Sequence, residues 1–326
     1  MSAQDVVRMY ASPQLSRPYM VAAWSGMGAV ALLAANFLRQ ELDARLLGEI
    51  DPYPFFSPSQ VLVQDGLFQE LEFPDQKLYY WKRGEGHDLV LLIGTEQPDN
   101  THDMAGVVLD TAQQLGVERI YTGAALAMFM HHAQFPQVWG TVTHPELLAD
   151  LETHHVRTLE QGSISGLNGL LLPLARERGI QGVCLLGELP VYATQLVNPR
   201  ATRAVLGVLA GMLHLDLDLT KLEPWIENIE PQLDRLYRML PEHAQEAIAS
   251  RQDMPGASQP AAAHADQPLV ANEQFFAEIE RYLKDHDHPD VDSDEAPEDA
   301  SDITPDITPD NTPEDEPDTP RDEQEK

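Results

Sequence analysis

Residues 19–42 decide the fold, and they read YMVAAWSGMGAVALLAANFLRQEL. An apolar run from Tyr19 to Trp24 is broken by Ser25–Gly28 and restarts as a helical pattern that carries no charge before Arg39. This pattern predicts a strand, a glycine turn and a buried helix. The two glycines let the backbone turn sharply and leave amide N–H groups at a helix N-terminus, where a carboxylate, a phosphate or a partner's carbonyl is favoured.

Strand and helix patterns alternate through the first 215 residues. The apolar runs that predict strands are Met20–Trp24, Arg45–Ile50, Gln60–Val63, Lys77–Lys82, Asp88–Ile93, Arg119–Ala124, Val138–Val142 and Gln181–Leu186. The helical patterns are Gly28–Leu42, Asp103–Leu115, Pro145–Leu151, Ser165–Arg178 and Pro199–Leu213. The alternation predicts an α/β fold, a mostly parallel sheet between two helical layers with a hairpin-like insertion near residues 60 to 83.

After residue 215 the alternation of strand and helix patterns ends. We expect an α/β domain over residues 1–215, a helical extension packed on it over 216–249, a flexible linker over 250–268, an amphipathic helix over 269–285 and a disordered acidic tail over 286–326. In the amphipathic segment one stripe is apolar, consisting of Phe275, Phe276, Ile279, Tyr282 and Leu283. That helix either caps its own domain or docks on a partner.

The charge is strongly negative and unevenly distributed. The formal net charge is −32; residues 285–326 hold 18 acidic and 2 basic residues, which is −16, and the other 284 residues hold 35 and 19, which is also −16. Neither part offers the basic surface that binds a phosphate backbone, so nucleic acid is not an expected partner. The single cysteine, Cys184, excludes disulfides within the chain and fits a reducing cytoplasm. Since no stretch approaches about 18 consecutive apolar residues, we expect no membrane span.

The first glycine loop formally matches the dinucleotide-binding fingerprint. Gly26, Gly28 and Ala31 occupy its three small positions, and Glu49 or Asp51 ends the next strand near the place of a ribose-binding acid. Small residues also occur wherever a parallel strand turns tightly into a helix. We therefore favour a structural turn and expect no cofactor.

A second glycine cluster, Gly162–Gly169, precedes the helical run Leu170–Arg178. A phosphate would fit a helix N-terminus, but no Gly-Lys-Thr follows, and Ser165 lacks the glycine two residues earlier that a nucleophile elbow requires. Ser163 or Ser165 as a helix N-cap is the simpler interpretation.

The remaining candidates for chemistry are histidines and carboxylates. The pairs His131–His132 and His154–His155 lack the spacing of metal ligands, so we expect no metal site. Glu96 and Glu188 each follow an expected strand, at the edge where open α/β sheets place their sites. Without an identifiable nucleophile or base, loop capping is the favoured role for both.

Four stretches in this order carry a family resemblance: AWSGMG at 23–28, LIGTEQP at 92–98, GSISGLNGLLL at 162–172 and LGELPVY at 186–192. Their order and spacing resemble the proteasome assembly chaperone 2 (PAC2) family over roughly residues 15–240. The segment Glu273–Lys284 is similar to a short helix that actinobacterial members carry near their ends.

The resemblance implies a phosphorylase-like α/β/α sandwich, a homo-oligomer for which a trimer is plausible, and, in eukaryotic and archaeal branches, a chaperone role toward proteasome subunits. Archaeal relatives that dock on proteasomes end in a hydrophobic-Tyr-x tripeptide, whereas this sequence ends Gln324-Glu325-Lys326. Some bacterial members carry a predicted ATP-grasp ligase label, but no lysine-rich nucleotide loop supports it here.

Two functional hypotheses follow. The first is a cytoplasmic, non-enzymatic interaction or assembly protein; the second is an enzyme or small-molecule binder with a pocket at the strand ends. The residues expected to bind a ligand or partner are Ser25, Gly26, Gly28, Gly94, Glu96, Gly162, Ser163, Gly166, Glu188, Phe275 and Phe276.

Overall fold

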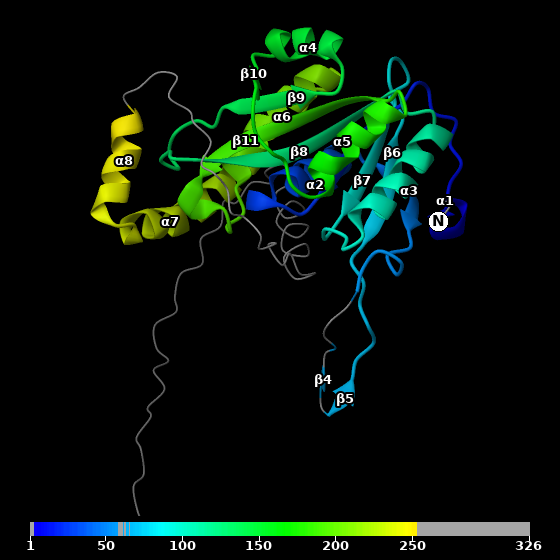
Figure 1. Ribbon diagram of the computed structural model, residues 1–326, viewed down its shortest axis with the longest axis horizontal. Coiled ribbons are helices and arrows are strands. Elements are labelled where there is room, and N and C mark those ends of the chain that lie inside the picture. Colours follow the sequence, from blue (N-terminus) through cyan, green and yellow to red (C-terminus); the bar gives the residue numbers. More distant parts are fainter. Residues whose placement is uncertain (1–2, 58–60, 62, 65, 253–326) are drawn as a thin grey trace, which may run out of the picture. The chain divides into compact units, whose positions relative to one another are not determined.

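The computed structural model describes residues 3–57, 61, 63–64 and 66–252. Its centre is a nine-stranded sheet (Figure 1). From one edge to the other, the strands are β1 (Val7–Met9), β3 (Arg45–Ile50), β6 (Gln76–Trp81), β7 (Leu89–Gly94), β2 (Tyr19–Trp24), β8 (Arg119–Met128), β11 (Gln181–Pro190), β9 (Val138–Val142) and β10 (Arg157–Thr158).

The four central strands β7, β2, β8 and β11 run parallel to one another. On one side of them β6, β3 and β1 follow in antiparallel pairs, and on the other side β9 is antiparallel to β11. The carboxyl ends of the four parallel strands therefore meet at one edge of the sheet. The predicted α/β fold with a mostly parallel sheet is confirmed.

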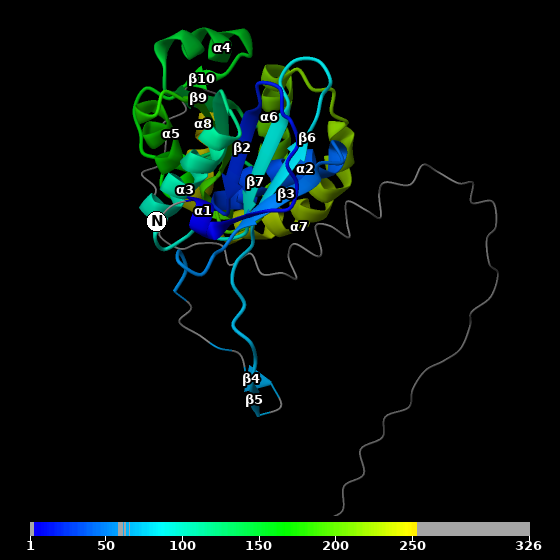
Figure 2. The same ribbon diagram turned by 90° about the vertical axis from the view of Figure 1, so that its right-hand side faces the viewer.

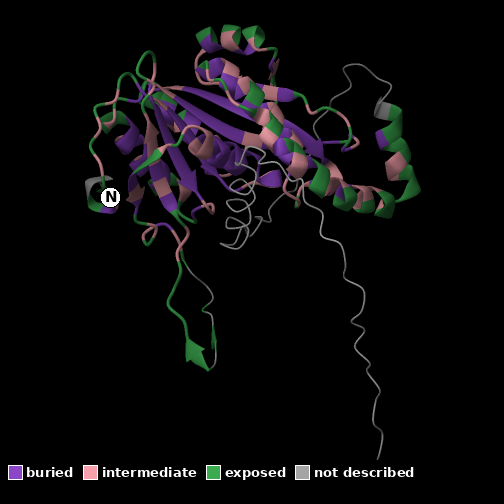
Figure 3. Ribbon diagram, turned by 180° about the vertical axis from the view of Figure 1, so that it is seen from behind, coloured by how far each residue is buried: buried purple, intermediate pink, exposed green. Residues whose placement is uncertain are grey.

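Helices cover both faces of the sheet (Figure 2). Helices α2 (Val30–Glu41) and α6 (Pro199–Leu213) pack on one face, and α3 (Thr101–Gln114) and α5 (Leu167–Glu177) pack on the other. The shorter elements are α1 (Ala3–Val6), α4 (Leu148–Thr153), and the 3-10 turns η1 (Met27–Ala29), η2 (Pro145–Leu147), η3 (Val191–Ala193) and η4 (Leu219–Leu222). Figure 3 shows the buried sheet between the two layers, which confirms the expected sandwich.

The opening stretch forms the core of the sandwich. Met20, Ala22 and Trp24 of β2 lie in the core on the α3–α5 side, whereas Val21 and Ala23 lie in the core on the α2–α6 side. This strand buries both faces, as its unbroken apolar sequence predicts. Helix α2 begins at Val30, two residues later than expected, because the turn η1 precedes it.

Two expectations about strand length were wrong. Strands β8 and β11 run four residues beyond the expected ends at Ala124 and Leu186. They pair in parallel along this whole length, as far as Pro190 opposite Met128. Mutual pairing, rather than composition, extends both strands, so Glu188 lies inside β11 and not in a loop after it.

The insertion forms a separate two-stranded ribbon. Residues 60 and 62 of the expected strand Gln60–Val63 lie outside the described residues, and Val63–Gln64 is β4, which pairs with β5 (Leu67–Phe68). Figure 1 shows this ribbon projecting away from the sheet. The expected strand Lys77–Lys82 instead joins the main sheet as β6.

The C-terminal helices α7 (Glu223–Met239) and α8 (Glu242–Gln252) follow η4. Ile226 and Leu233 of α7 are buried, and Glu230 and Glu223 form ion pairs with Arg200 and Arg203 of α6. Among the described residues, no helix has the length and apolar character needed to cross a membrane. The predicted linker from residue 253, the amphipathic segment with Phe275 and Phe276, and the acidic tail lie outside the described residues.

Candidate functional site

The parallel strands separate at the edge where a site was expected. Strand β2 pairs with β7 as far as Trp24 opposite Gly94, but its pairing with β8 ends two residues earlier, at Ala22 opposite Thr122. On the β8 side, the backbone of Trp24 is therefore left without a strand partner. In open α/β sheets such a crevice at the strand ends is the usual place for a ligand.

Here a side chain of the protein itself occupies that place. The Asn168 side chain accepts a hydrogen bond from the backbone N–H of Trp24 at 2.9 Å and donates one to the Trp24 carbonyl at 3.1 Å. Asn168 belongs to the first turn of α5 and is only 4% exposed. Its amide thus replaces the missing strand, since a buried backbone group without a partner is costly.

Two glutamines complete the closure. The indole N–H of Trp24 donates to Gln76 Oε1 at 2.8 Å, and both side chains are buried. Gln97 donates from Nε2 to the Ser25 carbonyl at 2.7 Å and accepts from the backbone N–H of Leu167 at 2.8 Å. The loops after β2 and β7 and the start of α5 are therefore joined by hydrogen bonds through side-chain amides.

The structure brings together six of the sequence-predicted residues at this edge, and Glu96, in the loop after β7, is one of them. Ser25, Gly26 and Gly28 follow β2, Gly94 ends β7, and Gly166 precedes α5. A Cβ atom at Gly166 would lie 2.9 Å from Gln97 Oε1, and one at Gly26 would lie 3.8 Å from Asn168 Nδ2. The prediction missed the polar side chains that join these loops: Gln76, Gln97 and Asn168.

The first glycine loop is packed against protein. Gly28 has a left-handed φ of 64°, its N–H donates to the Thr194 carbonyl at 3.2 Å, and a Cβ atom there would lie 2.7 Å from Leu189 Cδ2. The acids expected for a ribose are remote, because β7 and β6 separate β3 from β2, and Glu49 binds Arg8 at 3.1 Å. This geometry favours the structural turn over the dinucleotide fingerprint.

Ser25 and Glu96 remain as polar groups at the edge. Ser25 is 2% exposed, and its Oγ has no hydrogen-bond partner in the part of the chain that the structure describes. Glu96 is half-buried, and burial raises the pKa of its carboxyl, to which the nearby charge of Asp99 adds. Ser163, which the sequence also predicts as a binding residue, is exposed in the loop before α5.

Two other predicted residues lie elsewhere. Glu188 is buried, and its carboxylate accepts hydrogen bonds from the backbone N–H of Gln137 at 3.0 Å and from the Trp139 indole at 2.8 Å. It therefore joins β11 to the chain entering β9. Gly162 lines a separate cavity beside α5.

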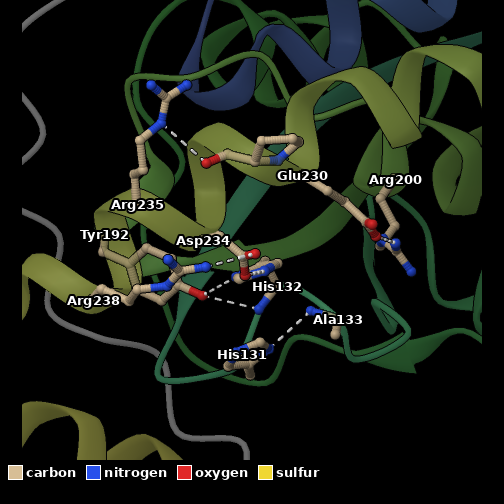
Figure 4. A network of polar contacts seen from close by, with 10 residues as sticks. His131, His132, Ala133, Tyr192, Arg200, Glu230, Asp234, Arg235 and Arg238 are labelled. Carbon is tan, nitrogen blue, oxygen red and sulfur yellow. Dashed lines mark hydrogen bonds and ion pairs between the residues drawn. The ribbon is translucent and has the colours of Figure 1, made fainter.

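A histidine network closes the ends of β8 and β11 (Figure 4). His132 follows β8, Tyr192 follows β11, and Asp234 comes from α7. Tyr192 OH accepts from the backbone N–H of His132 at 2.9 Å and lies 2.9 Å from His132 Nδ1, while His132 Nε2 lies 3.1 Å from Asp234 Oδ1. A carboxylate can only accept, so Nε2–H of His132 donates to Asp234, and Nδ1 of the neutral imidazole then accepts from the phenol O–H of Tyr192.

This network holds a neutral imidazole. Burial lowers the pKa of His132, the neighbouring His131 lowers it further, and Asp234 and Glu230 oppose both effects. Burial raises the pKa of Tyr192 to about 12, so its phenol keeps its proton. The network therefore holds α7 against the ends of β8 and β11 through the contact between His132 and Asp234. It does not supply an activated nucleophile. Among the described residues, no group of three or more His, Cys, Asp or Glu is arranged to hold a metal ion.

Comparison with known proteins now identifies the family. The model of the PAC2 family matches residues 20–237. This chain belongs to the PAC2 family.

Two proteins of solved structure and one further protein are similar to this chain over most of their own length. PbaB of Pyrococcus furiosus, described as an archaeal proteasome activator, is 29% identical with a TM-score of 0.60, and the match covers 71% of this chain and 97% of PbaB. PbaA of the same organism, described as an archaeal homolog of proteasome-assembly chaperone, is 26% identical with a TM-score of 0.54 over 76% of this chain and 99% of PbaA. The uncharacterized protein MJ1210 of Methanocaldococcus jannaschii is 28% identical over 68% of this chain and 84% of its own length.

Within this PAC2 chain, Gly94 tests the closure of the strand ends. A Cβ atom at residue 94 would overlap the Trp24 ring and lie 2.5 Å from Gln76 Oε1. We expect Gly94→Ala to lower the free energy of unfolding by about 1–3 kcal/mol through overpacking, measured by urea denaturation. Gly106→Ala is the matched control, because a Cβ atom there meets nothing within 4 Å and α3 gains a better helix former. Equal urea midpoints for Gly94→Ala and the wild type would contradict this account.

A second prediction concerns the histidine network. The folded state holds His132 neutral, with a pKa below the value of about 6.5 in the unfolded chain. The contribution of His132 to the free energy of unfolding is therefore complete above about pH 6.5, and it is lost as the pH falls toward the lower folded-state pKa. NMR titration should find the His132 pKa below about 6.5, and Asp234→Asn should lower it further by removing the opposing carboxylate. The loss of urea stability between about pH 7.5 and about pH 5.5 should be smaller in His132→Gln than in the wild type. A His132 that titrates above its ordinary pKa would refute the assignment.

Proposed function

We propose that this chain is a non-enzymatic interaction protein, with a role like that of an assembly chaperone, that acts as a homo-oligomer in the cytoplasm. The observation that carries the proposal is the closure of the strand ends: Asn168 occupies the crevice between β2 and β8. An enzyme of this architecture needs that edge for its substrate. In the part of the chain that the structure describes, the side chains of Asn168 and the two glutamines form hydrogen bonds to protein groups that border this crevice.

The β4–β5 ribbon supports a role in protein contacts. Val63, Leu67 and Phe68 are 59%, 68% and 80% exposed, and Leu71 just beyond the ribbon is 53% exposed. An isolated two-stranded ribbon is marginally stable in water, and clustered exposed apolar side chains mark interaction sites. We propose a second copy of the chain as the partner of the ribbon, in a closed assembly for which a trimer is plausible.

The other partners are proposed from the relatives. PbaB and PbaA are described as a proteasome activator and as a homolog of a proteasome-assembly chaperone, so proteasome subunits are the first partners to test. The bacterial, actinobacterial-type assignment within the family rests on Glu273–Lys284, which lies outside the described residues. A cytoplasmic location agrees with Cys184, which is fully buried with its thiol pKa raised to about 11 by burial.

The proposed homo-oligomer can be tested directly by measuring the molar mass of the protein in solution. We expect the wild type to elute as an oligomer by size-exclusion chromatography with light scattering, and Phe68→Ser to shift the mass toward the monomer, because it removes the most exposed apolar side chain of the ribbon. Phe135→Ser is the matched control, since Phe135 is 75% exposed in the loop between β8 and β9. A monomeric wild type, or a mass unchanged by Phe68→Ser, would refute the proposed interface.

The partner role is tested on co-expressed proteasome subunits. We expect the full chain to be recovered with them in native mass spectrometry, and truncation before Leu269 to reduce the recovery if the stripe with Phe275 and Phe276 docks on a partner. Unchanged recovery by the truncated chain would assign binding to the α/β domain alone.

The competing enzymatic hypothesis rests on Ser25 and Glu96. Turnover of a metabolite by the pure protein, abolished by Ser25→Ala, would contradict our proposal and support an enzyme.

A further inference from the structure

A cavity of about 420 Å³ lies beside α5, and its lining includes none of the side chains that close the strand ends. Four segments line it: the end of β9, the loop over residues 159–164, one side of α5 and the middle of β11. Helix α5 packs on β8 and β11, while β9 lies beyond β11 in the sheet. The loop therefore roofs space that no helix of that layer fills. The volume is within the range of small-molecule sites.

The inner part of the cavity is apolar. Cys184 of β11 and Leu172 of α5 are 0% and 4% exposed, and Leu159 and Ile164 of the loop are half-buried. The Cys184 thiol is protonated at neutral pH, because burial raises its pKa to about 11. This floor suits a branched aliphatic group, since it offers neither a charge nor a reactive thiolate.

The outer part of the cavity carries one charge of each sign. Arg176 of α5 and Glu160 of the loop both line it and both are exposed. Neither forms a side-chain ion pair within the described part of the chain, and they do not pair with each other. The neighbouring Arg178, by contrast, is paired with Asp110. Among the described residues, Arg176 and Glu160 therefore leave one unpaired guanidinium and one unpaired carboxylate in the lining of the cavity.

We propose that this cavity binds a small zwitterion with an apolar body, an α-amino acid or short peptide with a branched aliphatic side chain. The Arg176 guanidinium matches the planar geometry of a carboxylate, and the Glu160 carboxylate accepts from an ammonium group. The aliphatic group fills the floor between Leu172 and Ile164. This inference does not depend on the proposed assembly role, because the lining of the cavity includes neither the side chains that close the strand ends nor any residue of the β4–β5 ribbon.

Ligands that carry only one of the two charges distinguish a site for a zwitterion from a cavity that binds the aliphatic group alone. The probes are L-leucine, L-leucyl-L-leucine, 4-methylpentanoate, which lacks the ammonium group, and 3-methylbutylamine, which lacks the carboxylate. We expect at least one of the two zwitterions to bind more tightly than either single-charge analogue in calorimetry on the full chain. Both exposed charges are hydrated before binding, so the expected preference is several-fold, up to roughly tenfold.

Substitutions at the two charges should have opposite selectivity. Arg176→Gln should lower the affinity for the zwitterion and for 4-methylpentanoate, and it should leave the affinity for 3-methylbutylamine unchanged. Glu160→Gln should lower the affinity for the zwitterion and for 3-methylbutylamine, and it should leave the affinity for 4-methylpentanoate unchanged. Arg178→Gln is the matched control, because its partner Asp110 lies on α3. Binding of neither zwitterion, or zwitterion binding that both substitutions leave unchanged, would overturn the proposal. The molar mass of each variant is measured in parallel. A change in ligand binding at an unchanged molar mass concerns the cavity and not the proposed oligomer.

Discussion

The two hydrogen bonds between the Asn168 side chain and the Trp24 backbone set the arrangement of the whole carboxyl edge of the sheet. They exist because β2 and β8 separate after Ala22, while β2 continues beside β7. Once α5 supplies an amide to the end of β2, its first turn must lie over this crevice. Gln97 can then reach both Ser25 and Leu167, so one constraint orders three loops.

Much of the fold could be predicted from local sequence, and the closure of the edge could not. The apolar run of β2, the uncharged pattern of α2 and the limits of α6 follow from short-range periodicity and from the Asn-Pro start of α6. The contact between Trp24 and Asn168 spans 144 residues, and no periodicity reports such a pairing. What the sequence did offer was polar residues beside the glycines, Gln97 and Asn168, within stretches that otherwise suggested loops around a ligand.

Glu188 shows why buried polar residues were misinterpreted. A carboxylate after an apolar run resembles the start of a loop, because acidic residues are depleted in strands. In the structure β11 continues through it, since β8 pairs alongside and Gln137 and Trp139 satisfy the carboxylate. A polar residue near the end of a strand is therefore either a ligand-binding group or an internal partner. Only the position of the neighbouring elements distinguishes the two.

Closing the strand ends changes where recognition can occur on this architecture. An α/β sheet normally offers one rigid edge at which loops of several strands converge. Here that edge carries internal hydrogen bonds of Asn168 and Gln97 on one side and α7, fastened through His132, on the other. The proposed contacts with other molecules accordingly use parts outside this edge, the β4–β5 ribbon and the cavity beside α5. Because the chain is strongly acidic, the proposed contact between two copies has to rest on apolar burial, for which the exposed side chains of the ribbon offer a surface.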